Sequence, residues 1–279
     1  MGGADVAVAK YLLVSSVLLA ASGAYSQIEE PTFSDKDCEF IHSYGRDGSA
    51  SFISDFLDRV HSDRSNWIDE FPVRDSDVEL IKFAESVHLG ILVDQDIDMY
   101  SEVTAEVQFW LEIADDETPF EYDLGRPVER PLLSVLIGDV RLEDRELIEE
   151  IYPDSETVSQ FLEAETSPCM VLVNTELDSS IRRSSVIADG RIIGRQIMDC
   201  VSTAIVVAFG LSPLPASSSH LETAESQRET SYPFTSHRDF VQRERLMLRL
   251  LYSEEIEVGS DLETTMSTAS SIIDQACPD

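Results

Sequence analysis

The sequence predicts a folded protein of the α/β (α+β) class, with a mixed sheet packed against a central buried helix and C-terminal helices. Short apolar runs typical of strands alternate with longer segments whose apolar residues recur every three to four positions. Hydrophobic residues make up 43% of the 279 residues, which is the content of a chain with a core. The segment 194–211 is apolar on nearly every side, which indicates a helix buried all round.

The N-terminus has the features of a secretory signal peptide over residues 1–26. Lys10 precedes the apolar run Tyr11–Ala21, and small residues stand at Ala24 and Ser26. An uncleaved membrane anchor is the alternative, but the apolar run is short for a bilayer span. We therefore expect export to a secreted or periplasmic location, with no membrane span after cleavage.

Residues 27–78 are expected to form an N-terminal extension with one short helix, and 79–279 the main domain. Segment 27–48 is acidic and is predicted to be irregular. The expected helix places five apolar residues on one face. These residues are Phe52, Ile53, Phe56, Leu57 and Val60.

In the main domain, alternating or continuous apolar runs predict strands, and three-to-four spacing predicts helices. Ser155 is a candidate N-cap for a helix that carries Val158 and Phe161. The predicted strands are Val87–Val93, Leu132–Ile137, Met170–Val173 and Ser184–Ala188. The other predicted helices are Tyr100–Ala114, the central segment ending at Gly210, Phe240–Tyr252 and Asp261–Gln275.

The formal net charge is −34, from 54 acidic and 20 basic side chains. Such a charge repels phosphate backbones and anionic lipid, so nucleic acid is not an expected partner. A solvated acidic surface explains the charge most simply. A cation-binding surface or a cationic partner is the alternative.

Four cysteines in an exported chain favour disulfides over metal ligands, and none lies in a CxxC pair. Three pairings are possible. We favour Cys169–Cys200, which would join a strand to the central helix, and Cys38–Cys277, which would join the two ends of the mature chain.

The motifs for common cofactors and catalytic sites are missing, so no cofactor is expected. Asp94, Asp96 and Asp98 have the spacing that begins a calcium loop, but Met99 and Ala105 stand where its glycine and glutamate belong. No two histidines have the i, i+4 spacing of a helical zinc site. Nucleophile elbows, phosphate loops and dinucleotide-binding turns are also missing. The histidines are His42, His61, His88, His220 and His237.

The second half of the chain resembles the secreted bacterial domain-of-unknown-function family 2927. The resemblance rests on Cys200 with Phe209-Gly210-Leu211, on the helix Glu244–Tyr252, and on Ile256 followed by Gly259. It covers about 79–275, and Cys169 matches an upstream cysteine of that family. The family is similar in layout to the zincin metallopeptidases, in which the helix before Gly-Leu carries HExxH.

The resemblance implies that the active-site helix of this chain is degenerate. Where a zincin has HExxH and the family has E-E-x-x-Q, this chain has Thr203, Ala204 and Val207. These side chains supply neither strong zinc ligands nor a catalytic base. We expect a secreted, non-catalytic interaction or structural module with a protein or envelope partner that the sequence does not identify. The alternative is a hydrolase that uses carboxylates outside the lost positions.

Overall fold

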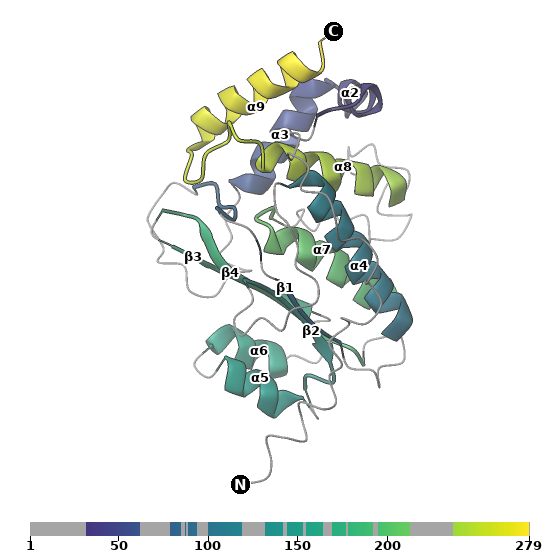
Figure 1. Cartoon of the computed structure of the whole chain (residues 1–279), viewed down its shortest axis with the longest axis vertical. Coiled ribbons are helices and arrows are strands. Elements are labelled where there is room, and N and C mark those ends of the chain that lie inside the picture. The colour runs from purple at the N-terminus through teal and green to yellow at the C-terminus, as the bar shows by residue number, and fades with distance from the viewer. Residues whose placement is uncertain are drawn as a thin grey trace, which may run out of the picture.

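In the part of the chain that the structure describes, a four-stranded sheet lies between two helical layers, and four further helices stack on one end of this unit (Figure 1). The computed structural model describes residues 32–61, 79–84, 87, 89–93, 100–118, 132–141, 144–152, 155–163, 169–176, 178–191, 195–212 and 237–278. The expected signal peptide lies outside the described residues, as do Asp94, Asp96 and Asp98.

The sheet has the strand order β1-β2-β4-β3. Its strands are β1 (Leu89–Val93), β2 (Leu133–Gly138), β3 (Cys169–Thr175) and β4 (Ile181–Asp189). β1, β2 and β4 run parallel, and β3 pairs with β4 in the antiparallel direction at one edge. The sheet is therefore mixed, and the predicted fold class is confirmed.

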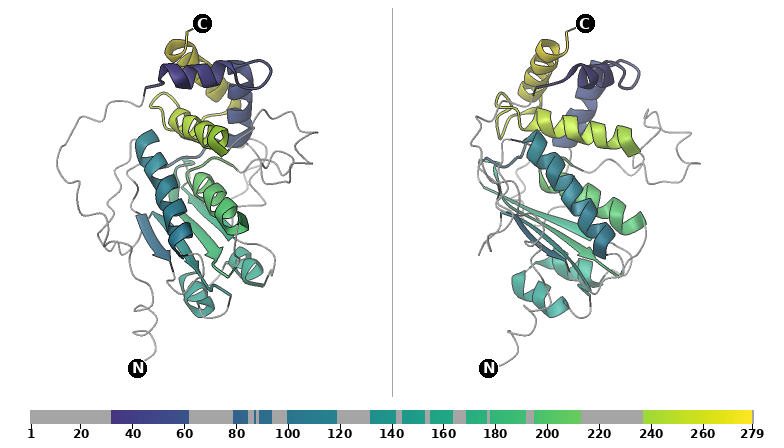
Figure 2. Two further views of the ribbon diagram at one scale, coloured as in Figure 1. Left: turned by 90° about the vertical axis from the view of Figure 1, so that its right-hand side faces the viewer. Right: turned by 45° about the vertical axis from the view of Figure 1, so that its right-hand side comes forward.

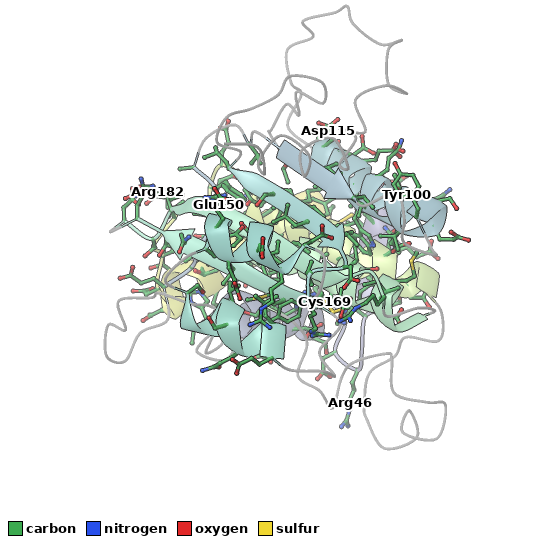
Figure 3. The ribbon with its side chains drawn as sticks, turned by 90° about the horizontal axis from the view of Figure 1, so that it is seen from below. Arg46, Tyr100, Asp115, Glu150, Cys169 and Arg182 are labelled. Atoms are coloured by element: carbon green, nitrogen blue, oxygen red, sulfur yellow. A yellow bond between two sulfur atoms is a disulfide. The ribbon has the colours of Figure 1, made fainter. Side chains whose placement is uncertain are left out.

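Helices cover both faces of the sheet (Figure 2). On one face lie α4 (Tyr100–Glu117) and α7 (Arg195–Ala208), and on the other α5 (Arg145–Ile151) and α6 (Glu156–Glu163). Figure 3 views the molecule from the α5–α6 side, with Glu150 of α5 in front of the sheet. Because strands buried on both faces need apolar residues at successive positions, β2 is a continuous apolar run except for Ser134.

Four helices form the layer at the end of the sheet (Figure 1). They are α2 (Asp35–His42), α3 (Ser49–Val60), α8 (His237–Leu251) and α9 (Leu262–Ala276). α3 packs against α9, and α8 packs against α4. Their buried side chains join the same core as one face of the sheet. The described part of the extension expected before residue 79, α2 and α3, is thus packed on the C-terminal helices.

The prediction of an irregular segment 27–48 and a single N-terminal helix was wrong, because α2 forms within that segment. α2 begins with a capping box, in which the Asp37 amide donates to Ser34 Oγ at 3.3 Å and the Ser34 amide donates to Asp37 Oδ2 at 2.9 Å. This reciprocal pair satisfies two backbone donors at the helix start. The spacing Ser-x-x-Asp was the signal that the acidic composition obscured.

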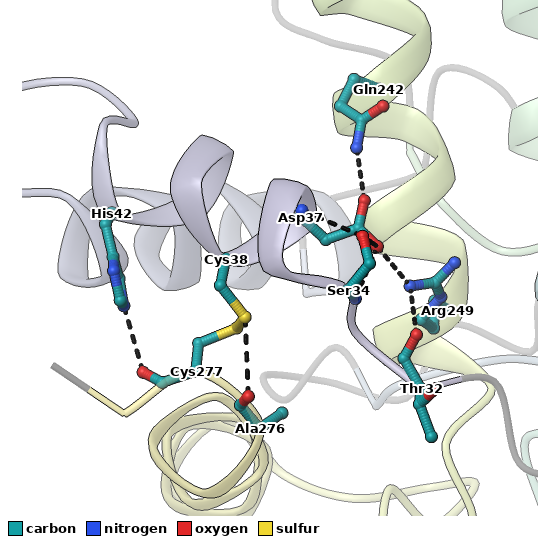
Figure 4. Close-up of a disulfide and its surroundings, with 9 residues drawn as sticks. All are labelled: Thr32, Ser34, Asp37, Cys38, His42, Gln242, Arg249, Ala276 and Cys277. Carbon is teal, nitrogen blue, oxygen red and sulfur yellow. Dashed lines mark hydrogen bonds and ion pairs between the residues drawn. A yellow bond between two sulfur atoms is a disulfide. The ribbon is translucent and has the colours of Figure 1, made fainter.

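Both favoured disulfides form, and each joins elements that are distant in the chain. Cys169–Cys200 links β3 to α7 with Cα atoms 6.0 Å apart. Cys38–Cys277 links α2 to the end of α9 with Cα atoms 5.1 Å apart (Figure 4).

Among the helices that the structure describes, none is long and apolar enough to cross a membrane.

Candidate functional site

The central helix α7 lies against β3, β4 and α4. Of the three positions that the resemblance singles out, Ala204 and Val207 are buried, with 3% and 5% of their surfaces exposed. Thr203 is partly exposed. Two of the three side chains are therefore part of the hydrophobic core, and the helix presents no strong metal-binding donor at these positions.

Gly210 ends the turn after α7. Its φ is +105°, and a Cβ at this position would collide with the carbonyl oxygen of Ile81. Its amide donates to the Val207 carbonyl at 2.9 Å. Glycine is the residue that adopts a positive φ and allows this close approach of two backbone segments. The backbone conformation of this turn therefore explains the glycine of the Gly210-Leu211 pair.

Glu106 of α4 is a carboxylate that contacts α7 next to Thr203. Its Oε1 accepts hydrogen bonds from Ser202 Oγ at 2.6 Å and from Trp110 Nε1 at 2.7 Å. Ser202 Oγ also lies 2.7 Å from the carbonyl of Met198. The half-buried carboxylate therefore joins α4 to α7, and it is an ionisable group beside the central helix.

Within the described ranges, no group of three or more His, Cys, Asp or Glu side chains is arranged to hold a metal ion. His42 Nε2 lies 3.1 Å from the carbonyl oxygen of Cys277, and His61 Nε2 lies 2.9 Å from Thr265 Oγ1. Both imidazoles thus contact α9 or the residue that follows it. His88 and His220 lie outside the described residues.

A cluster of charged side chains lies where the parallel strands β2 and β4 end. The buried Asp189 carboxylate lies 2.6 Å from Arg141 Nη1 and 3.0 Å from Arg191 Nη2, and Arg191 Nε lies 3.0 Å from Asp139 Oδ1. Burial acts against ionisation of Asp189, but Arg191 and Arg141 outweigh it and hold the pKa of this carboxyl below its usual range. Ligands bind at this edge in many parallel sheets. Here the charges pair with one another and link the strand ends.

A second cluster of charged side chains is buried between α3 and α8. Glu244, with a 1% exposed side chain, accepts from Arg59 of α3 and from its neighbour Arg243. Burial raises the pKa of Glu244, but Arg59 and Arg243 outweigh that effect and hold the pKa below its usual range. The arginine-rich helix of the sequence resemblance therefore places ion pairs in the interior.

A third cluster of polar and charged side chains connects α2 to α8 and α4. Asp37 accepts from Gln242 Nε2 at 2.6 Å and from Arg249 Nη1 at 2.9 Å (Figure 4). Arg249 Nε also donates to Glu117 at the end of α4, at 2.5 Å. These partners are far apart in sequence, so spacing alone could not have found them. The signal was the run of arginines among leucines in α8.

No protein-family model, curated protein or solved structure matches this chain.

Proposed function

We propose that this protein is an exported, non-catalytic binding module on a framework that resembles a metallopeptidase domain without its metal site. The observation that carries the proposal is the burial of Ala204 and Val207 in α7. The resemblance assigns these positions to a zincin's catalytic glutamate and second zinc-binding histidine. Alanine and valine offer neither a zinc ligand nor a base that could activate a water.

Two further features support the proposal. α7 packs against β3, β4 and α4, as expected for a central buried helix. The pairs Cys38–Cys277 and Cys169–Cys200 leave no free cysteine among the described residues. Disulfides persist in oxidising compartments, so the pairing favours an exported protein.

Metal analysis of the oxidised protein tests the absence of a zinc site. The protein is purified without chelator, incubated with excess zinc and passed through a desalting column. We expect only a small fraction of one zinc per chain, with the same melting temperature before and after chelator treatment. A stoichiometric zinc whose removal lowers the melting temperature would contradict the proposal, because ligands that bind the native state raise its stability.

A hydrolase is the second candidate, favoured by the position of Glu106 beside α7. A mixture of peptide and ester substrates is incubated with the native protein and with Glu106→Gln. The amide keeps an acceptor for Ser202 and Trp110 but removes the ionisable group. Glu112→Gln, on the exposed side of the same helix, is the matched control. Hydrolysis that is lost only in Glu106→Gln, with the fold intact, would establish the enzyme.

A further inference from the structure

The apolar stripe of α9 is longer than the surface that covers it. Leu262, Met266, Ala269 and Ile273 follow one another at intervals of four, three and four residues, so they lie along one side of the helix. Ala269 and Ile273 are buried, and α3 packs against α9. Leu262 and Met266 are 53% and 47% exposed. The N-terminal half of the stripe is therefore uncovered.

Large apolar side chains are seldom exposed elsewhere in the described part of this molecule. Leu262 and Met266 are two of three large hydrophobic residues that are exposed in the part of the chain that the structure describes, and the third is Phe109 of α4. Since they are four residues apart on a helix, their side chains are neighbours. Single exposed apolar residues are ordinary on a surface. Two that extend a buried stripe form a continuous contact surface, which we call the α9 patch together with its acidic neighbours Asp261 and Glu263.

The segment of the chain that carries the α9 patch has charge of one sign. Residues 253–279 contain no lysine, arginine or histidine. The acidic residues of this segment within the described ranges are all exposed. The acidic residues are Glu254, Glu255, Glu257, Asp261, Glu263, Asp274 and Asp279.

We propose that the α9 patch binds a cationic amphipathic helix of a partner protein. The apolar face of that helix would cover Leu262 and Met266, and its basic side chains would meet Asp261 and Glu263. Apolar anchors at intervals of three and four residues are how a helix recognises such a surface. Complementary charge speeds the encounter and selects the partner. This inference rests on the proposed binding function and names the surface that performs it.

The charge also decides between the possible occupants. A second copy of this chain would bring the same acidic segment against itself, and an anionic lipid surface would be repelled in the same way. A neutral apolar peptide would gain nothing from the exposed carboxylates of Asp261 and Glu263. A basic helix satisfies both the apolar and the charged parts of the patch.

Binding is tested with a synthetic peptide that has leucine at helical spacing and lysine on the opposite face, followed by fluorescence anisotropy at low and physiological salt. The native, disulfide-bonded protein is compared with the Leu262→Ser/Met266→Ser double variant. Both positions are exposed, so the substitutions leave the fold intact, which circular dichroism checks. We expect affinity to fall about tenfold or more, because buried apolar anchors dominate such contacts. Affinity should also fall as salt rises.

Phe109→Ser is the matched control, because Phe109 is exposed on a different helix. It should bind the peptide as the native protein does, and a scrambled peptide of the same composition should bind weakly to all three proteins. Equal binding of both peptides would indicate charge attraction alone, and equal losses in both variants would indicate apolar contact that is not specific to the α9 patch. Either result would overturn the proposal. A dimer that Leu262→Ser disrupts, seen by sedimentation of the protein alone, would also overturn it. Failure here leaves the zinc measurement unchanged, so the two proposals fail independently.

Discussion

Arg59 of α3 and Glu244 of α8 form an ion pair in the protein interior. Arg59 Nη1 lies 2.6 Å from Oε1 and 2.5 Å from Oε2 of Glu244, and the two side chains are 3% and 1% exposed. The Arg59 Nε also donates to the Ser212 carbonyl at 2.8 Å. One guanidinium thus joins α3, α8 and the segment after α7. The end layer is held to the sheet domain by charge as well as by apolar packing.

We expect Glu244→Gln to lower the free energy of unfolding by about 3–5 kcal/mol at neutral pH. The buried Arg59 would lose its ion-pair partner, and Arg243 would lose the nearer of its two acidic neighbours, Glu244 and Asp55. Urea denaturation measures the change. Glu149→Gln is the control, since Glu149 pairs with Arg145 on an exposed face of α5. That pair contributes about 0.5 kcal/mol or less. Equal effects of the two variants would contradict the structural role of Glu244.

Asp37→Asn should reduce the loss of stability at acid pH. The folded protein holds the pKa of Asp37 below the 3.8 of the unfolded chain, because the hydrogen bonds from Ser34 and the ion pair with Arg249 outweigh burial. As pH falls, the unfolded chain takes up this proton first, so the contribution of Asp37 is present above about pH 4 and disappears below it.

Urea unfolding at a series of pH values from about 6 to about 3 measures this effect. Stability of the native protein should fall more steeply than that of Asp37→Asn. Asp35→Asn, an exposed position on the same helix, should retain the native slope. Parallel curves for all three proteins would show that Asp37 has the same pKa in both states.

Removing the Cys38–Cys277 disulfide should cost more stability than removing Cys169–Cys200. The first spans 239 residues of sequence and the second 31. If loop closure in the unfolded chain dominates, the double Cys→Ser variants lose about 5 and about 3.5 kcal/mol. Thermal and urea unfolding of each double variant measure the difference. The reverse order would show that packing around Cys169 matters more than chain entropy.

Gly210→Ala should destabilise the protein by about 2 kcal/mol or more, because a positive φ and a collision with the Ile81 carbonyl act together. Gly259→Ala is the comparison. Its φ is +77°, but the nearest atom to an added Cβ, the carbonyl oxygen of Asp178, is 3.3 Å away. The cost there should be about 1 kcal/mol. Melting temperatures of the two variants rank the effects, and similar values would show that the Ile81 segment yields.

Local patterns in the sequence were sufficient for the sheet and for most helices. The short apolar run Leu132–Ile137 predicted β2, and Ser155 Oγ accepts from the amide of Val158 at 3.2 Å, as an N-cap does. α8 and α9 begin and end close to their predicted limits. These features depend on residues within one or two turns of each other, so spacing reveals them.

The interior ion pairs could not be read in the same way. Arg59 and Glu244 are 185 residues apart, and Asp37 and Arg249 are 212 apart. Nothing in the spacing of 54 acidic residues distinguishes the few that are buried. Asp37 was also hidden in a segment whose acidity suggested irregular structure. Only the family resemblance indicated the α7 positions, because alanine and valine are ordinary residues in a buried helix.

The Cys38–Cys277 bond turns almost the whole described chain into a covalent ring. A single backbone cut at any point between these two cysteines opens the ring but leaves one molecule of unchanged mass apart from one added water. The fragments separate only after reduction, so a nicked protein stays a single species on a non-reducing gel. The ring also brings α2 to the end of α9, which makes the protein a natural subject for circular permutation. New ends could be opened elsewhere in the chain while the two helices stay joined.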